Sequence, residues 1–413
     1  MSASMDRRGL FRGLAGTGLA AGAAGLAAGC AHAGASARAD EPATDAPDGP
    51  DRVISPYGEH QPGIAGEPGS AVSVLALDVV ATDRGGLAEA LKALSSRVGT
   101  LTQGYAPRPT GISGPPSDSG VLGPDVPADG LTVTVSVGAS LFDHRFGLAG
   151  AKPLRLKPMH AFADDDLDAA RCGGDLLLQV SADHGDTVLH AVRDLMRHTR
   201  GALAPRWRID GARPPSRPTG APRNHLGFKD GIANPSADDF DALVWAGDDE
   251  PAWTAGGSYH VVRIIRMLTE FWDRVGLSEQ ERMIGRRRDS GAPLSGSTDA
   301  DDPDYSDDPR GSVTPLDSHI RLANPRTDAT ADQRMLRRAW NYDAGLDLAG
   351  NLDLGLVFTC FQTDLERAFE TVQHRLQGEP LVDYITPVGG GYFFALPGLR
   401  DEQDRYGRGL LDT

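Results

Sequence analysis

The order of apolar segments along the chain constrains its fold more than any other feature. In the first half, these segments read as strand, helix, strand, strand, helix, strand. Leu87, Leu91 and Leu94 recur at helical spacing, whereas residues 131–137 (LTVTVSV) alternate apolar and polar side chains as in a half-buried strand. The predicted strands and helices are 73–80, 86–98, 131–137, 175–180, 186–198 and 206–209. This β-α-β-β-α-β order is the ferredoxin-like arrangement.

The second half shows a similar order of segments. Strands are predicted at 259–265, 355–361 and 391–395, and helices begin near residues 269 and 364. A length of 413 residues also exceeds what one ordinary domain needs. We therefore predict the α+β class, with two ferredoxin-like domains of antiparallel sheets and helices over residues 71–215 and 216–413.

The N-terminal residues have the features of an export signal. Arg7 and Arg8 precede a stretch rich in Gly, Ala and Leu that ends in small residues. Paired arginines indicate the twin-arginine export machinery. We predict a signal peptide over 1–39, a linker over 40–70, and a mature protein that is extracellular, periplasmic or associated with the cell envelope. Lipidation of Cys30, which would tether the protein to a membrane, stays open as an alternative.

Charge and cysteine content exclude several classes of protein. The net charge of −16 does not fit a nucleic-acid-binding protein, which needs a basic face. Cys30, Cys172 and Cys360 have no metal-site spacing and can form at most one internal pair, which excludes a disulfide scaffold and a structural zinc site. No segment after the signal approaches the ~18 apolar residues of a membrane span.

Three segments of the second half carry candidate functional residues. Asp230 lies in the turn-rich run GFKDG, His319 begins the run HIRLANPR, and Arg337 and Arg338 lie within 334–343. Each has a plain structural explanation when taken alone. Asp230 would then belong to a surface loop, His319 would be a hydrogen-bonded core histidine, and the arginines would form a solvated basic face.

Together, these segments resemble the dye-decolorizing peroxidases, a family of haem enzymes, over nearly all of the chain after the signal. The family signature GxxDG is present as Gly227-Phe228-Lys229-Asp230-Gly231 and precedes HIRLANPR and LRR in the family's order. The export signal, the HIRLANPR run and the closing GGGYFF run resemble the secreted branch that includes bacterial deferrochelatase/peroxidases. Further matching runs are HQPGI from His60, LFD from Leu141, GGDL from Gly173 and GSY from Gly257.

The resemblance implies one haem b per chain, sandwiched by the two domains and bound to iron through His319. A carboxylate that accepts the other imidazole N–H strengthens such a ligand. Asp383 is predicted for this role, with Glu379 as the alternative. Three further positions are predicted to contact the cofactor: Arg321, Leu356 and Phe358. For the two apolar ones, an ordinary core position is equally open.

On the opposite side of the haem, the resemblance implies Asp230 and Arg337 as the catalytic pair. Hydrogen peroxide must lose a proton from one oxygen and receive one on the departing oxygen, and a carboxylate can carry that proton. A guanidinium stabilises the negative charge that develops and stays charged at any working pH. Arg338 is adjacent, and the family position favours Arg337.

Three functions remain open at this stage. The first is a haem peroxidase that uses hydrogen peroxide to oxidise dyes, phenolics or other electron donors. The second is a deferrochelatase that removes iron from haem in an iron-uptake system, and the third is a haem carrier. An acid and an arginine on the distal side favour an enzyme, because carriage needs no proton transfer. The oligomeric state stays open, a homo-oligomer included.

Two further features of the sequence bear on roles around the haem. Bulky reductants cannot reach a buried haem, so surface aromatic residues are expected to relay electrons, with Trp340, Tyr342 and Tyr392 as candidates beside their ordinary role as core aromatics. The acidic loop 299–308 (DADDPDYSDD) is rich in oxygen ligands but lacks the pattern of a calcium loop, which favours a solvated loop.

Overall fold

The computed structural model describes residues 51–412. The predicted signal peptide, Cys30 and residues 40–50 of the predicted linker lie outside the described residues. Within the described residues, no helix is both long enough and apolar enough to cross a membrane.

The first half forms the predicted β-α-β-β-α-β unit. Its strands pair in the order β2-β3-β1-β4, and all neighbours are antiparallel. The elements are β1 (Ala71–Val79), α2 (Arg84–Gln103), β2 (Thr132–Gly138), β3 (Leu176–Ala182), α3 (Gly185–His198) and β4 (Leu203–Ala212).

The second half has the same strand order with much shorter helices. Its sheet reads β8-β5-β7-β6, again antiparallel throughout. The strands are β5 (Ser258–Met267), β6 (Leu336–Leu346), β7 (Leu352–Gln362) and β8 (Ile385–Ala395). The α-helices are α4 (Phe240–Leu243), α5 (Thr269–Trp272), α6 (Leu277–Ile284), α7 (His319–Ala323), α8 (Thr371–Leu376) and α9 (Arg408–Leu411). A π-helical turn, Glu366–Glu370, precedes α8. The predicted α+β class with antiparallel sheets is confirmed.

Strand β6 was not predicted from the sequence, where the segment 334–343 left two interpretations open, a solvated basic face and a catalytic Arg337. Leu336, Trp340 and Tyr342 are almost fully buried, at 1%, 1% and 2% exposure. They point to one face of the strand, because side chains alternate along an extended backbone. Because Arg337 and Arg338 interrupt the pattern of apolar residues, the sequence did not indicate a strand here.

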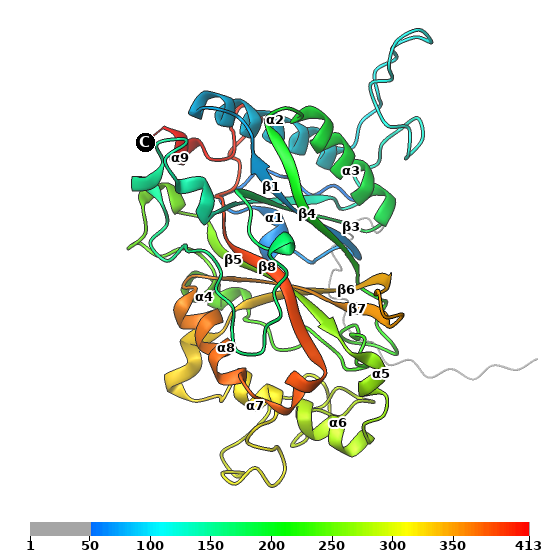
Figure 1. Ribbon diagram of the computed structural model, residues 1–413, viewed down its shortest axis with the longest axis vertical. Helices are drawn as coiled ribbons and strands as arrows, with labels where there is room; N and C mark the ends of the chain where they lie inside the picture. The colour runs from blue at the N-terminus through cyan, green and yellow to red at the C-terminus, as the bar shows by residue number, and fades with distance from the viewer. Residues whose placement is uncertain (1–50, 413) are drawn as a thin grey trace, which may run out of the picture. The chain divides into compact units, whose positions relative to one another are not determined.

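The two sheets join edge to edge into a closed barrel (Figure 1). Three residue pairs link β2 to β8, and a single pair, Ala212 with Asn341, links β4 to β6. An apolar cluster drawn from both sheets fills the space between them, which ties the halves together by burial. Its members are Val72, Val74, Ala76, Leu177, Trp207, Val262, Ile264, Trp340, Tyr342, Val357 and Phe393.

Residues 52–70 are packed structure and not the predicted linker. Gln61 is fully buried; its Nε2 donates to the carbonyls of Val135 (2.8 Å) and Leu396 (2.7 Å), and its Oε1 accepts from Val135 N–H. The short helix α1 (Pro62–Ala65) follows directly. A Cβ on Gly63 would lie 2.4 Å from Thr134 Oγ1, so the chain approaches β2 closely there. Pro and Gly content suggested a linker, whereas this segment uses those residues for close packing.

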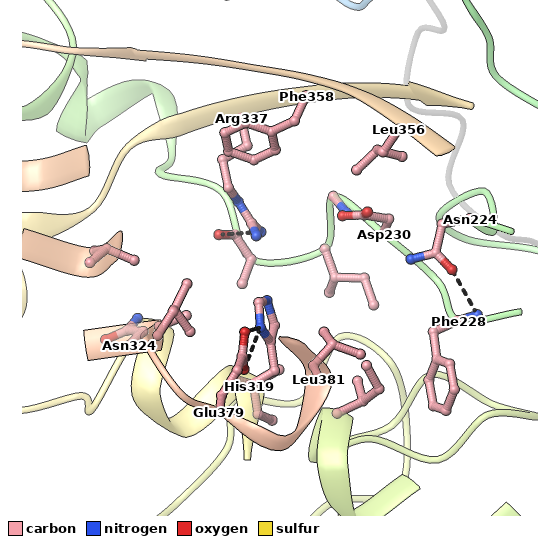
Figure 2. A pocket seen from close by; sticks show the side chains of 18 of the residues that line it. Asn224, Phe228, Asp230, His319, Asn324, Arg337, Leu356, Phe358, Glu379 and Leu381 are labelled. Carbon is pink, nitrogen blue, oxygen red and sulfur yellow. Dashed lines mark hydrogen bonds and ion pairs between the residues drawn. The ribbon is translucent and has the colours of Figure 1, made fainter. Parts of the chain in front are cut away.

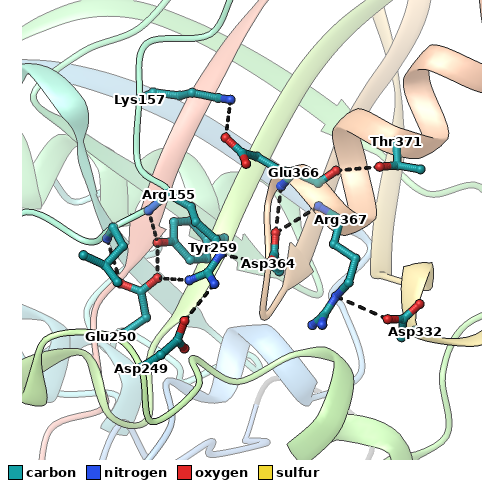
Figure 3. Close-up of polar contacts among 11 residues, drawn as sticks. Arg155, Lys157, Asp249, Glu250, Tyr259, Asp332, Asp364, Glu366, Arg367 and Thr371 are labelled. Carbon is teal, nitrogen blue, oxygen red and sulfur yellow. Dashed lines mark hydrogen bonds and ion pairs between the residues drawn. The ribbon is translucent and has the colours of Figure 1, made fainter.

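Ion pairs hold a loop of the first half against the second half (Figure 3). Arg155 pairs with Asp249 (2.7 Å), Glu250 (2.8 Å) and Asp364 (2.8 Å). Glu250 also accepts a 2.6 Å hydrogen bond from the buried Tyr259 hydroxyl. The arginine thus bridges segments about 95 to 209 residues distant along the chain.

Candidate active site

The main cavity, of about 270 Å³, lies on the outer face of the second sheet. All of its lining residues fall between Asn224 and Pro387. The lining of this cavity therefore comes from the second half alone. The space between the sheets is already filled by their shared apolar cluster, which leaves no room for a ligand there.

His319 is the first residue of α7, and its ring faces this cavity (Figure 2). Its Nδ1 lies 3.0 Å from both carboxylate oxygens of Glu379, whose side chain is only 2% exposed. Burial would lower the pKa of His319, but the charge and hydrogen bond of Glu379 outweigh it, so that the pKa is raised. With Nδ1–H donated to Glu379, Nε2 keeps its lone pair for a ligand in the cavity.

The carboxylate partner of the histidine is thus Glu379 and not Asp383, which is exposed. Glu379 precedes Pro380 and has an extended backbone (φ −61°, ψ 154°), as residues before proline prefer. This conformation begins the 3₁₀ turn Pro380–Asp383, which carries Asp383 past the histidine to the surface.

Asp230 lies across the cavity from His319 (Figure 2). Its Oδ1 accepts a 2.7 Å hydrogen bond from Gly231 N–H, and its own N–H donates to Pro222 O at 2.9 Å. Gly227 and Gly231 have φ of +87° and +84°, values that favour glycine, so the GxxDG run provides the tight loop that presents the acid.

Arg337 reaches the same side of the cavity from β6 (Figure 2). The side-chain amide of Asn234 brackets its backbone, accepting from Arg337 N–H (2.9 Å) and donating to Arg337 O (3.1 Å). Arg338 points the other way and donates to the carbonyls of Ile64, Ala65 and Gly66. Strand alternation therefore places Arg337, and not Arg338, in the cavity.

Apolar side chains make up most of the remaining wall. Leu356 and Phe358 lie two residues apart on the same face of β7 and line the cavity, and their contact with a cofactor stays a prediction (Figure 2). Others on the wall are Ile265, Met267, Ile284, Met335, Phe369, Leu376, Leu381 and Ile385.

Arg321 does not line the cavity, contrary to its predicted contact with a cofactor. Its guanidinium donates to Thr314 O (2.8 Å) and Asp308 O (2.9 Å) and lies 4.7 Å from the Tyr305 ring centroid. Arg321 follows His319 by two residues, which places its side chain on the opposite face of α7, against the acidic loop. Four arginines that line the cavity were not predicted from the sequence: Arg263, Arg286, Arg326 and Arg334.

The acidic loop 299–308 is held by protein groups. Asp308 accepts backbone N–H bonds from 312–314, and Asp299 pairs with Lys229 at 2.6 Å. Among residues 51–412, no group of three His, Cys, Asp or Glu side chains is placed to hold a metal ion.

The aromatic candidates for electron relay are all buried, so none is a surface residue. Trp340 is 1%, Tyr342 2% and Tyr392 3% exposed. Trp340 and Tyr342 belong to the cluster between the sheets. The Tyr392 ring lies 5.8 Å from that of Phe369, which lines the cavity.

A histidine–carboxylate pair that faces an acid and an arginine across an apolar cavity, on paired ferredoxin-like sheets, defines a class of haem enzymes. The chain belongs to the DyP-type peroxidase family: the family's N-terminal model matches residues 61–213, and its C-terminal model matches residues 221–400.

Individual relatives support this assignment. The chain is 48% identical over 402 residues to a deferrochelatase of Escherichia coli (strain K12), covering 94% of this chain and 95% of that protein. It resembles the crystal structure of the DyP-type peroxidase from Cellulomonas bogoriensis, with a TM-score of 0.80, 35% identity, and coverage of 88% and 100%. Ferric DtpA from Streptomyces lividans gives a TM-score of 0.79 at 34% identity, with coverage of 88% and 98%.

Proposed function

We propose that this protein binds haem in the cavity of its second half and releases the iron from it, with peroxide-driven oxidation as a second activity of the same site. The observation that carries the proposal is the His319–Glu379 pair opposite Asp230 and Arg337. The DyP family is haem-binding, and the name deferrochelatase of relatives at 48% identity favours iron release over the peroxidase as the main function.

The residues of the cavity fit haem. Apolar side chains suit the flat macrocycle, and the free Nε2 of His319 is a suitable iron ligand, with Glu379 raising its basicity. Arg286 provides positive charge for the carboxylate edge of the haem, beside Arg326 and Arg334, which pair with Asp302 (2.8 Å) and Asp239 (3.2 Å). No covalent attachment is proposed, because the chain has no Cys-x-x-Cys-His run.

In iron release, two ring nitrogens must each take a proton when the metal leaves. Asp230 is the titratable group at the distal wall that can deliver protons there. The His319–Glu379 pair lies on the other side and can hold the iron while it is withdrawn.

The peroxidase is the second candidate, and Arg337 is the observation that favours it. Haem supplies the iron at which peroxide is reduced when it is bound. Asp230 can then move a proton from one peroxide oxygen to the other, and the Arg337 guanidinium stabilises the negative charge on the departing oxygen. This function requires hydrogen peroxide and a reducing substrate.

Product analysis tests the two functions and the haem carrier together. The protein is incubated with haem, with and without peroxide and a phenolic donor, and the pigment is extracted. Iron-free protoporphyrin supports iron release, oxidised donor with intact haem supports the peroxidase, and intact haem without reaction supports the carrier. Asp383→Asn is a matched control, because this carboxylate is exposed and does not line the cavity.

We also propose export by the twin-arginine route, on the strength of Arg7 and Arg8. Replacing both by lysine keeps their charge and should leave an unprocessed precursor in the cytoplasm. Cell fractionation followed by immunoblotting measures this. Normal export of the double variant would instead point to the general secretory route.

A further inference from the structure

A second pocket, of about 310 Å³, lies behind the distal wall of the main cavity. The two share part of their lining, including Asp230 and Arg337. Pro214, Ser216 and Gly220 on its wall are exposed, so the pocket opens to solvent. We call it the arginine pocket, because four arginines line it: Arg213, Arg223, Arg337 and Arg338.

Positive charge in the arginine pocket exceeds negative charge. Glu67 and Asp230 are the acidic residues of its lining, against the four arginines. Glu67 pairs with Arg213 at 3.2 Å, but the Glu67 side chain is 84% exposed, which makes this pair weak. The pocket thus carries an excess of about two positive charges.

The other three guanidiniums have no carboxylate within ion-pair distance among residues 51–412. Arg223 donates to the carbonyls of Gly227, Arg288 and Asp289. Arg337 donates to Ala233 O, and Arg338 to backbone carbonyls only. These bonds satisfy hydrogen-bonding capacity and orient the groups, but they do not neutralise charge.

Unneutralised charge of this kind is unfavourable. Burial lowers the pKa of Arg338, and the nearby charge of Arg213 lowers it further, against an opposing effect of Glu67. Buried charges in proteins are normally paired, so a counter-ion from solution would stabilise this arrangement. Guanidinium groups match the oxygens of carboxylates and phosphates in geometry as well as in charge.

We propose that the arginine pocket is a binding site for a small oxyanion with two or more negative charges, a polycarboxylate or inorganic phosphate. The charge excess sets the valence, and the volume restricts the ligand to a small molecule. A bound anion would lie beside Asp230 and Arg337, at the wall shared with the main cavity. The site rests on the pocket alone and does not depend on the proposed function.

Isothermal titration calorimetry on the purified protein, with and without added haem, tests this site. Citrate, phosphate, acetate and uncharged glycerol are titrated in turn at low salt. We expect one citrate or one phosphate per chain, much weaker binding of acetate, none of glycerol, and loss of affinity as salt rises. Whether citrate or phosphate binds more tightly identifies the class of oxyanion.

Two variants and a matched control locate the site. Arg213→Gln should weaken binding about tenfold, because it removes one charged donor. Ser216→Asp adds a negative charge at the exposed rim and should also weaken binding while all four arginines remain. Arg208→Gln is the control, since Arg208 lies on β4, which ends one residue before Arg213, pairs with Asp210 and does not line the pocket.

The absence of binding by both citrate and phosphate would overturn the proposal. So would binding that neither Arg213→Gln nor Ser216→Asp weakens, or an equal loss in Arg208→Gln. Acetate binding as tightly as citrate would refute the required valence. Circular dichroism of each variant shows whether a loss in Arg213→Gln reflects unfolding, and Ser216→Asp then decides.

Discussion

The two sheets of this protein have the same strand order, yet their outer faces differ. Over the first sheet lie α2, with 20 residues, and α3, with 14, and they bury Leu87, Leu91 and Leu94 completely. Over the second sheet lie α5 to α8, with four to eight residues each. These short helices leave a cavity of about 270 Å³. A ferredoxin-like sheet covered by long helices is a scaffold, whereas the same sheet covered by short helices has space for a ligand.

The contrast arises in the segment that leads into the second strand of each half, β2 or β6. In the second half, the long segment between α6 and β6 contains α7 and its His319, and the acidic loop. In the first half, the segment between α2 and β2 carries no helix and is largely exposed. This connection therefore contributes His319 to the cavity, whereas Arg337, Leu356 and Phe358 come from the sheet itself.

The largest expected effect is loss of haem binding in His319→Ala. This change removes the nitrogen that faces the cavity, so the haem absorbance spectrum should be lost or strongly altered. Absorption spectroscopy after reconstitution with haem measures it. His198→Ala in α3 of the first half is the control and should bind haem as before. A normal spectrum of His319→Ala would show that the second half does not bind haem through this residue.

The next effect concerns the distal pair. Arg337→Leu removes a permanent positive charge from the cavity wall and should slow the reaction with peroxide about 10²- to 10³-fold. Asp230→Asn should slow it less, because water and Arg337 can still assist the proton. Stopped-flow absorbance of the haem-loaded variants after mixing with peroxide measures both rates. Full rates in both variants would reject the distal mechanism and leave haem binding untouched.

Core truncations should separate the two outer faces by stability. Leu94→Ala opens a void in the closed packing of α2 and should reduce the free energy of unfolding by about 2–5 kcal/mol. Leu356→Ala borders the existing cavity and should reduce it by about half as much, because fewer packing contacts are lost. Urea denaturation of haem-free protein compares them. Equal losses would mean that the second face is packed as tightly as the first.

The smallest effect is a pH dependence where the two sheets meet. His260 on β5 is fully buried, with Nδ1 3.0 Å from Ser136 Oγ of the first sheet, and burial lowers its pKa to about 3. The unfolded chain takes up a proton at the ordinary pKa of about 6.5, whereas the folded one does not. The contribution of His260 to the free energy of unfolding is therefore fully present above a pH of about 6.5. Below that pH it should fall by about 1.4 kcal/mol per pH unit.

His260→Leu removes this titration and serves as its test. The difference in unfolding free energy between wild type and variant is measured by denaturation from pH 7.5 to 5.5. We expect the wild type to lose stability relative to the variant over the acidic part of this range. A difference that stays constant with pH would show that His260 titrates normally in the folded protein.

Residues of the candidate site that belong to a short local motif could be predicted from the sequence. Asp230, His319, Arg337, Leu356 and Phe358 were each named from a run of residues, and all line one cavity. Their roles in binding and catalysis stay predictions.

Other residues of the site could not be predicted, because their place depends on the direction in which the side chain points. Asp383 and Glu379 are four residues apart in one acidic segment, and only the turn after Pro380 decides which of them meets His319. Arg321 lies two residues from His319, but helical geometry turns it to the acidic loop. Strand β6 was missed because its arginines mask the alternation of buried residues.

The sequence by itself determined the strands and helices of the first half, because the periodicity of apolar residues is a local property of the chain. It also determined the residue types of the site through short motifs. Only the tertiary structure decided that the sheets close into one barrel and that the cavity lies outside it. Only the tertiary structure places Glu379 beside His319, which lies 60 residues away in the sequence. The arginine pocket likewise forms from segments that are distant in the sequence, between Glu67 and Leu356. Such contacts depend on how distant segments pack, and no local pattern of residues encodes the distance between them.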